Sequence, residues 1–312
     1  MQRLTDNKII LIHRSTRLDE LVRRYNTVQQ AKFYIEHLGV DFSDYQKEHD
    51  HYYAMLTEIT HVLEQLGRVQ LVDRQFLPTF VFGPQDSVVT VGQDGLVANT
   101  LKYLDGQPLV AINPDPQRWD GVLLPFEAKD LKRIMPEVFQ RKRPLKQVSM
   151  ALAELNDGQK LYAVNDLFVG PKSHVSARYR LSFNRQEEQH SSSGLIVSTG
   201  LGSTGWFKSL VTGARGVSAS LGESVSPDER ETSFPWDAGY LRFIVREPFT
   251  SQTTGANLVA GQVSSSNPLR ITSLMPDYGV IFSDGIESDF LQFNSGAIAM
   301  IRPAEKTGNL VV

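Results

Sequence analysis

The sequence predicts an α/β domain built on a parallel, three-layer sheet, followed by a mostly β domain. In the first part of the chain, short apolar runs alternate with stretches in which apolar residues recur at helical spacing. After about residue 143, short β-rich runs are separated by glycine, serine, asparagine and proline. The chain has 312 residues, of which 41% are hydrophobic, which is enough for two packed cores.

The elements of the first domain follow from its hydrophobic pattern. Short apolar runs bounded by polar residues predict strands at 8–13, 69–72, 87–91 and 109–112. Apolar residues at helical spacing predict helices over 18–38, ended by Gly39, and over 55–66, ended by Gly67. Residues 94–104 are long enough for a crossover helix between the last two strands. Strands that alternate with helices predict a parallel sheet with helices on both faces.

The second domain is predicted from runs rich in β-forming residues. Strands are expected at 161–169, 177–183, 195–199, 240–245 and 280–282. We place the boundary near Arg143, so that the first domain covers residues 1–143 and the β-rich domain begins at residue 144.

Composition narrows the classes of function. Lys and Arg total 32 against 35 Asp and Glu, a net charge of −3, which argues against a general nucleic-acid binder. Because the chain has no cysteine, it has neither a disulfide nor a thiolate metal site nor a thiol nucleophile. No apolar run approaches the roughly 18 residues that a membrane span needs. We therefore expect a cytoplasmic globular protein that binds neither nucleic acid nor membrane and builds no metal site from its own side chains.

The first candidate site is the turn Gly92-Gln93-Asp94-Gly95, which directly follows the predicted strand 87–91. A glycine-bearing turn between a strand and a helix gathers bare N–H groups and a positive helix dipole, which suits a phosphate. Asp94 repels such an anion unless it has a chemical task, such as deprotonating an attacking hydroxyl. Helix N-capping explains the aspartate equally well. Both interpretations stay open on spacing alone.

The second candidate site is the loop Gly200-Leu201-Gly202-Ser203-Thr204-Gly205, which follows the apolar run 195–199. Its glycine spacing matches the dinucleotide fingerprint, but the preceding chain is β-rich rather than part of a βαβ unit. We therefore reject an ordinary dinucleotide-binding fold at this loop. Three glycines and two hydroxyls beside Trp206 are able to hold a polar ligand and stack a base, and a tight turn with a core tryptophan is the alternative.

Two further polar segments are candidates for a site. Asn165 and Asp166 lie within the run 161–169 and have side chains suited to ribose hydroxyls, although a turn also explains them. Asn113-Pro114-Asp115-Pro116 ends a predicted parallel strand, which is where the sites of α/β domains open, and a proline-containing loop explains the segment equally well.

Together, these motifs resemble the NAD kinase family, and they are most similar to its mitochondrial-type branch. The family has a Gly-Gly-Asp-Gly turn, an Asn-Glu/Asp pair and a Gly-Ser-Thr loop that ends in an aromatic residue. In this chain the similarity is carried, in order, by residues 92–95, 110–118, 165–170 with 176–178, 192–206, 244–249, 283–285 and 293–299. The order of the motifs is more specific than any one of them.

The resemblance implies a fold and a reaction. The fold is a nucleotide-binding α/β domain over 1–143 and a β-sandwich-like, NAD-binding domain over 144–289, with residues 290–312 returning to the first domain and NAD between the two. The reaction transfers a phosphoryl group from ATP, or polyphosphate in some members, to the 2′-hydroxyl of the adenosine ribose of NAD. Mg²⁺ accompanies the donor, and family members are usually homo-oligomers.

The resemblance also implies a role for each matching residue. Asp94 is the general base, and Gly92, Gln93 and Gly95 form the turn on the phosphate side. The residues implied in NAD binding are Asn165, Asp166, Thr199, Gly202, Ser203, Thr204 and Trp206.

The chain departs from the family at two positions of the first turn. Gln93 replaces the second glycine, and Leu96 replaces the threonine that usually follows the turn, which removes a hydroxyl beside the donor phosphates. A side chain at residue 93 is costly if that residue needs a positive φ. These departures keep a second hypothesis open, a non-catalytic NAD(P)-binding protein. A lipid kinase of the related diacylglycerol and sphingoid-base group is a third, which the Gly-Ser-Thr-Gly-Trp loop disfavours.

Overall fold

A computed structural model describes residues 3–222 and 232–312, and the chain divides into two compact units. Unit 1 comprises Met1–Lys146 and Asn309–Val312, and unit 2 comprises Gln147–Gly308. Unit 2 thus spans residues 147–308, and the limits expected for the β-rich domain from the sequence are 144 and 289.

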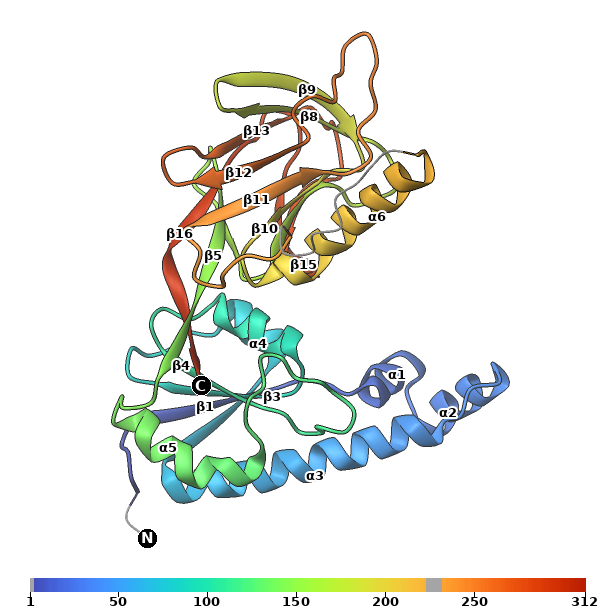
Figure 1. The fold of residues 1–312 in the computed structure, drawn as a ribbon. Coiled ribbons are helices and arrows are strands. Elements are labelled where there is room, and N and C mark those ends of the chain that lie inside the picture. The colour runs from blue at the N-terminus through green and yellow to red at the C-terminus, as the bar shows by residue number, and fades with distance from the viewer. Residues whose placement is uncertain (1–2, 223–231) are drawn as a thin grey trace. The chain divides into compact units, whose positions relative to one another are not determined.

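Unit 1 is built on a parallel sheet with the strand order β2-β1-β3-β4 (Figure 1). Its strands are β1 (Lys8–His13), β2 (Arg68–Asp73), β3 (Ser87–Val91) and β4 (Pro108–Ile112). The end of β16 (Ile298–Val311) adds Asn309 and Leu310 beside β4, also in parallel. The parallel sheet predicted from the alternating pattern is confirmed.

Helices cover both faces of this sheet (Figure 1). On one face, α3 (Ser43–Leu66) and α5 (Leu131–Phe139) pack against β1, β3 and β4 around Leu11, Ile59 and Ile134. On the other lies α4 (Asp94–Leu101), whose residues Leu96–Leu101 are all buried. The three-layer prediction is therefore correct, although the sequence analysis predicted no helix at the position of α5. The connections also contain two short 3₁₀ turns, η1 (Arg74–Thr79) and η2 (Ala128–Asp130).

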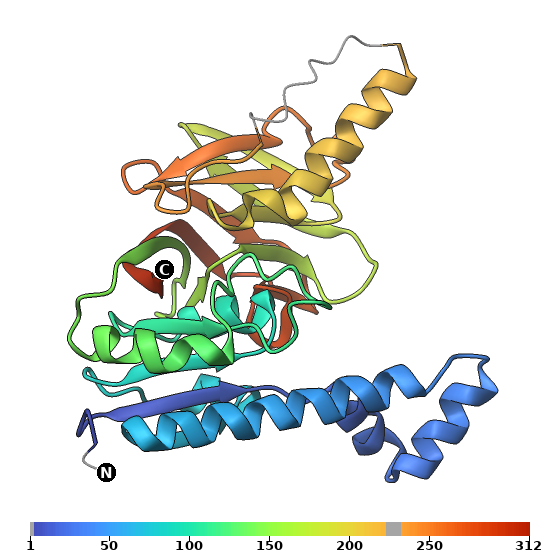
Figure 2. The ribbon, with the colours of Figure 1, turned by 60° about the horizontal axis from the view of Figure 1, so that its bottom comes forward.

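The prediction of one helix over 18–38 is wrong, because the segment forms α1 (Arg17–Tyr25) and α2 (Val28–His37). Asn26 has φ 67°, a left-handed conformation that ends α1. Thr27 then begins a new helix, because its side chain accepts a hydrogen bond from the backbone N–H of Gln30. Figure 2 shows α1 and α2 packed at the far end of α3, where Leu18, Ile35 and Phe42 form a small core of their own.

Unit 2 is a sandwich of two antiparallel sheets. The first contains β5 (Leu145–Leu155), β6 (Lys160–Ala163), β8 (Ala177–Phe183), β9 (Gln186–Ser192), β13 (Leu269–Ser273) and the main part of β16. The second has the order β12-β11-β10-β7-β14-β15, with bounds Ala260–Ser264, Tyr240–Val245, Leu195–Ser198, Asp166–Pro171, Gly279–Ser283 and Ile286–Gln292. The mostly β, sandwich-like prediction for this part of the chain is confirmed.

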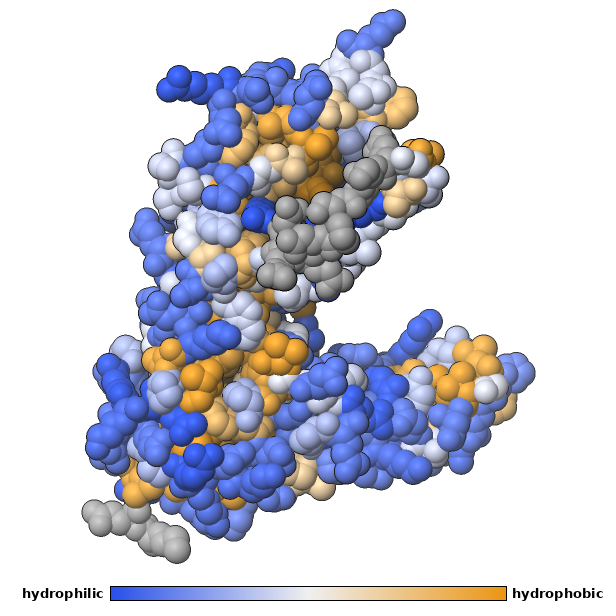
Figure 3. All heavy atoms as spheres, in the orientation of Figure 1, coloured by the Kyte–Doolittle hydropathy of each residue, from blue (hydrophilic) through white to orange (hydrophobic). Residues whose placement is uncertain are grey.

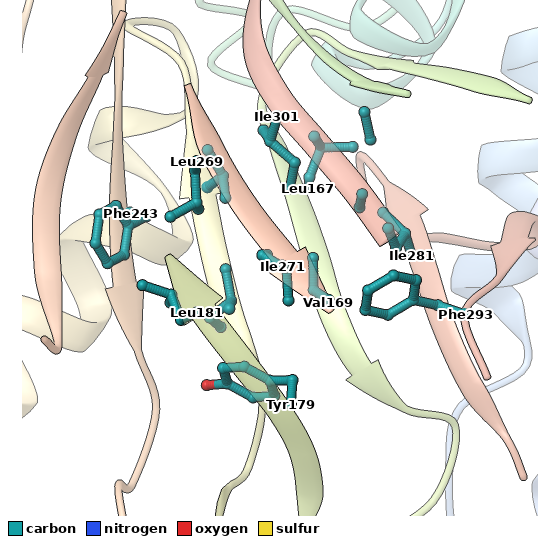
Figure 4. Close-up of a cluster of buried hydrophobic side chains, with 14 of the residues drawn as sticks. Leu167, Val169, Tyr179, Leu181, Phe243, Leu269, Ile271, Ile281, Phe293 and Ile301 are labelled. Atoms are coloured by element: carbon teal, nitrogen blue, oxygen red, sulfur yellow. The ribbon is translucent and has the colours of Figure 1, made fainter. Parts of the chain in front are cut away.

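The core of unit 2 lies between these sheets (Figure 4). Leu167 and Val169 of β7 and Ile281 of β14 meet Leu181 and Ile271 of the facing sheet. Because alternate residues of a strand point to opposite faces, Phe168 of β7 lies on the outer face instead.

Two features of unit 2 differ from the sequence prediction. The run 161–169 forms two strands, β6 and β7, because Val164 and Asn165 lie between them and donate backbone hydrogen bonds to Asp284. A helix, α6 (Trp206–Ser220), follows the 3₁₀ turn η3 (Gly202–Thr204), where no helix was predicted. It packs through Trp206 and Leu210 on the outer face of the second sheet. In the described ranges, no helix is long and apolar enough to cross a membrane.

Candidate functional site

The strand order of unit 1 creates a switch point between β1 and β3. The chain leaves β1 for β2 on one side and leaves β3 for β4 on the other. In such sheets ligands bind outside the carboxyl ends of the two strands at which the order reverses. Gly92 and Gln93 follow β3 at this edge and lead into α4, whose first residue is Asp94.

The carboxylate of Asp94 is held by one of its two oxygens. Oδ1 accepts a hydrogen bond of 2.7 Å from the backbone N–H of Leu123. The side chain is only half-buried. The interpretation of Asp94 as the helix N-cap is wrong, because Gln93 occupies the N-cap position of α4. The side chain of Gln93 makes no capping hydrogen bond. The side chain of Asp94 is therefore oriented by a loop and does not cap its own helix.

The loop that holds Asp94 follows β4 and contains the Asn-Pro-Asp-Pro segment. The amide of Asn113 donates to the carbonyl of Trp119 at 3.0 Å, and its Oδ1 accepts from the N–H of Asp115 at 3.0 Å. The backbone of Asn113 also donates to the carbonyl of Phe126 at 2.8 Å. These bonds at the start of the loop fix the turn that presents the N–H of Leu123.

The other residues of the first turn explain the two departures from the family pattern. Gln93 has φ −115°, which is ordinary extended backbone, so its side chain causes no strain here. Leu96 is buried, and a Cβ added at Gly92 would lie 2.9 Å from its Cδ2. Leu96 thus occupies the space over the bare Gly92 backbone. At Gly95, by contrast, an added Cβ meets nothing within 4 Å.

In unit 2, the Asn165 and Thr199 segments form one tightly connected cluster. The carbonyl of Asn165 accepts from the backbone N–H of Thr199 at 2.9 Å. The Thr199 hydroxyl donates to the carbonyl of Val164 and accepts from the N–H of Gly202 at 3.2 Å. A Cβ at Gly202 would lie 2.0 Å from the carbonyl oxygen of Asn165. Glycine is therefore required at residue 202 by close chain packing.

Asp284 completes this cluster and was not among the predicted site residues. It follows β14, and its carboxylate accepts hydrogen bonds from the consecutive N–H groups of Val164, Asn165 and Asp166 at 2.6–3.3 Å. The signal in the sequence is the Ser-Asp-Gly turn at 283–285, in which Asp284 has φ 55°. Asp284 thus fixes the backbone that displays Asn165 and Asp166.

Asp166 has the most perturbed environment of the predicted site residues. Its side chain is 7% exposed. Burial, with a further contribution from the charge of Asp284, raises the pKa of Asp166 to about 7. A buried carboxyl with such a pKa is able to donate or accept a hydrogen bond near neutral pH, so a polar ligand that bonds to it would affect its protonation.

Trp206 faces a different part of unit 2. Its ring stacks on Phe168 with centroids 5.8 Å apart, and the guanidinium of Arg246 lies 5.4 Å from its centroid. These residues line a hollow of about 610 Å³, together with Lys172, His174 and Phe282 among others. That volume lies within the range of small-molecule sites.

The structure therefore brings some of the predicted residues together within unit 2, and the others lie in a second part of unit 2 or in unit 1. Asn165, Asp166, Thr199, Gly202 and Ser203 lie in one cluster; the Ser203 hydroxyl donates to the carbonyl of Gly200 at 2.6 Å. Thr204 is exposed beside them, and Trp206 belongs to the hollow. Gly92, Gln93, Asp94 and Gly95 lie in unit 1. Over residues 3–222 and 232–312, no three acidic or histidine side chains are placed to hold a metal ion.

Comparisons with known proteins add the following. No family model and no curated protein matches the chain. Among solved structures, it is similar to yeast NADH kinase complexed with NADH, with a TM-score of 0.60 and 16% identity over 99% of this chain and 84% of that one. It is also similar to an NAD kinase from Archaeoglobus fulgidus in complex with ATP, with a TM-score of 0.53 and 16% identity over 98% and 93%. The chain thus has the fold of these kinases along its whole length.

Proposed function

We propose that this protein is an NAD kinase-like phosphotransferase that converts NAD to NADP. It transfers a phosphoryl group from ATP, or from polyphosphate, to the 2′-hydroxyl of the adenosine ribose. The observation that carries the proposal is the position of Asp94 at the switch point of a fold shared with an NADH kinase and an NAD kinase. The ordered motifs from residue 92 to residue 299 give it independent support from the sequence.

Asp94 acts as the general base in this proposal. One of its oxygens is held by Leu123, which leaves the other to accept the proton of the 2′-hydroxyl. The 2′-oxygen then attacks the terminal phosphorus, the bond to the bridging oxygen breaks, and ADP or a shortened polyphosphate leaves. The turn formed by Gly92, Gln93 and Gly95 receives the donor phosphates at the N-terminus of α4.

Mg²⁺ fits this site as a companion of the donor. It binds in proteins through one or two carboxylates together with substrate phosphates and water. The described residues supply no cluster of three ligands, so the donor phosphates and water would hold most of the ion, and Asp94 would keep its second oxygen for the 2′-hydroxyl. The ion would neutralise charge on the transferred phosphoryl group.

Unit 2 supplies the NAD-binding residues in this proposal. Asn165 and Asp166, displayed by Asp284, hydrogen-bond ribose hydroxyls, and Thr199, Gly202, Ser203 and Thr204 shape the adjoining surface. Trp206, in the 610 Å³ hollow, stacks against a planar ring of the dinucleotide.

We also propose that the protein is cytoplasmic and homo-oligomeric.

A second candidate function is a non-catalytic NAD(P)-binding protein, which is favoured by one observation. Leu96 fills the space over Gly92 and carries no hydroxyl for the donor. Restoring the family pattern separates the two functions. If the parent is inert and Gln93→Gly with Leu96→Thr gains activity, the chain is a degenerate kinase. A parent that already forms NADP excludes the non-catalytic function.

The test of the proposed function is NADP formation by the purified protein with NAD, Mg²⁺ and either ATP or polyphosphate. A rate with one donor supports the kinase. NAD binding without a rate for either donor contradicts it.

A further inference from the structure

Arg14 lies at the same switch point as Asp94 but on the other strand. It directly follows β1, and the parallel register that pairs Ile12 with Thr90 sets it level with Gly92. A Cβ added at Gly92 would lie 3.6 Å from Cδ of Arg14, the atom bonded to Nε. The guanidinium end of Arg14 therefore lies beside the glycine turn.

Contacts from α3 hold Arg14 in a fixed orientation. Nη2 donates to Oε1 of Glu48 at 3.1 Å, and the guanidinium lies 5.4 Å from the ring centroid of Tyr52. The Tyr52 hydroxyl accepts from the backbone N–H of Arg14 at 3.0 Å and donates to the carbonyl of Val91 at 2.9 Å. Tyr52 thus ties the carboxyl ends of β1 and β3 together around this side chain.

One nitrogen of the Arg14 guanidinium has no hydrogen-bond partner in the described chain. Nη1 donates to the carbonyl of Ser15 at 3.0 Å, whereas the Nε atom is buried and has no hydrogen-bond partner in the described chain. A buried charged donor without a partner is costly, so its presence calls for an explanation. Glu48 is not the missing partner of Nε, because one of its oxygens bonds to Nη2 of Arg14 and the other pairs with Arg17.

A second feature at the same edge is complementary to an anion. The N-terminus of α4 has no side-chain cap, since Gln93 makes no capping bond. The first N–H groups of a helix have no partner within it, and the helix dipole places partial positive charge there. A phosphate at this turn would meet these N–H groups and would lie beside the guanidinium end of Arg14.

We propose that Arg14 binds the phosphate groups of the phosphoryl donor, with Glu48 and Tyr52 as the residues that position it. This inference rests on the proposed function and adds a donor-binding residue on β1 to the turn after β3. The ligand class is a linear polyphosphate chain, free or as part of a nucleoside triphosphate. Arginine suits such a ligand because it stays charged, and a hydrogen bond from a charged donor to a phosphate oxygen is strong.

The experiment compares wild-type protein with Arg14→Gln, Arg14→Lys and a control, Arg133→Gln. Arg133 is a guanidinium of the same unit that is 60% exposed and pairs with Asp130. Binding of inorganic tripolyphosphate is measured by calorimetry without NAD, and the KM for ATP is measured in turnover. We expect Arg14→Gln to weaken both by about 10- to 100-fold, Arg14→Lys to lie between, and the control to stay within about twofold of wild type. NAD affinity should be unchanged.

A further variant separates direct contact from an indirect effect of the buried Glu48 carboxylate, which loses its hydrogen bond to Arg14 in Arg14→Gln. The double change Arg14→Gln with Glu48→Gln restores the charge balance without restoring the donor. Direct contact predicts that tripolyphosphate binding stays weak, and recovery to within about twofold of wild type would overturn the role of Arg14.

The outcomes also distinguish this inference from the proposed function. If wild type forms NADP and Arg14→Gln keeps the KM for ATP, the role of Arg14 is overturned and the kinase stands. If tripolyphosphate binds through Arg14 but neither donor yields NADP, the anion site stands and the kinase is overturned. If wild type does not bind tripolyphosphate, the anion site is overturned.

Discussion

Oδ1 of Asp94 lies 2.7 Å from the backbone nitrogen of Leu123, twenty-nine residues along the chain in the loop after β4. This bond orients a half-buried carboxylate at the carboxyl edge of the sheet and uses only one of its oxygens. A carboxylate that served only as a helix cap would instead accept from the N–H groups of its own first turn. The central prediction concerns this residue.

Changing Asp94 to Asn should remove turnover and leave the fold intact. Asn keeps an oxygen that accepts the N–H of Leu123 but cannot take the proton of the 2′-hydroxyl, so kcat should fall by about 10²- to 10⁴-fold. NAD affinity and Tm should stay close to wild type. Asp120→Asn, an exposed residue of the same loop, is the matched control and should keep full activity. Equal turnover in Asp94→Asn would exclude the base role.

Gly95→Ala should affect donor binding without harming the fold. An added Cβ meets nothing within 4 Å, and alanine favours the first turn of α4. If donor phosphates pack on this backbone, the methyl group should raise the KM for ATP by about tenfold or more. An unchanged KM in a folded variant would place the donor elsewhere.

Gly202→Ala should destabilise unit 2. The new Cβ would lie 2.0 Å from the carbonyl oxygen of Asn165, so the loop must shift at a cost of about 1–3 kcal/mol. Thermal unfolding should show the loss, and NAD titration should show weaker binding. Gly213→Ala in α6, where an added Cβ meets nothing within 4 Å, should instead be neutral or slightly stabilising. Normal stability of Gly202→Ala would contradict the described packing.

Asp166→Asn should stabilise the protein in a pH-dependent way. Burial raises the pKa of Asp166 from 3.8 to about 7, so the folded state holds a proton that the unfolded state has released. Stability of the wild type therefore decreases as pH rises from about 4 to 7, by at most about 4 kcal/mol from this group, and the loss stays constant above pH 7. Asn carries no charge and avoids this loss.

The measurement is Tm for wild type and Asp166→Asn between pH 4 and 8. The difference should be largest at pH 8 and smallest at pH 4. A difference in Tm that does not change with pH would mean that burial does not shift the titration of Asp166. Asp157→Asn, on an exposed turn, controls for the loss of one carboxylate.

The sequence predicted the parts of the fold whose pattern depends on local spacing. The buried strand at 8–13 was predicted at its observed bounds, because apolar residues are continuous where both faces of a parallel strand are covered. The prediction of one helix over 18–38 was wrong because the apolar spacing continues through Asn26, where the positive φ of the backbone ends the first helix. The helix after Trp206 was missed, since glycines and serines in its sequence resemble those of loops.

The candidate site shows the same division between local and distant causes. Gly92–Gly95 and Asn165–Asp166 were predicted as candidates because each is a compact motif beside a strand. Asp284 and Arg14 were not among the predicted candidates, because each acquires its position from segments distant in the sequence. Asp284 bonds to Asn165 from 119 residues away, and Arg14 reaches the glycine turn only through the register of β1 and β3.

The most direct test of the central claim is NADP formation by wild type and Asp94→Asn, assayed side by side with NAD, Mg²⁺ and either ATP or polyphosphate. The proposal predicts a clear rate for wild type with at least one donor and a rate lower by about 10²-fold or more for the variant. Wild-type protein that binds NAD but forms no NADP with either donor would contradict it.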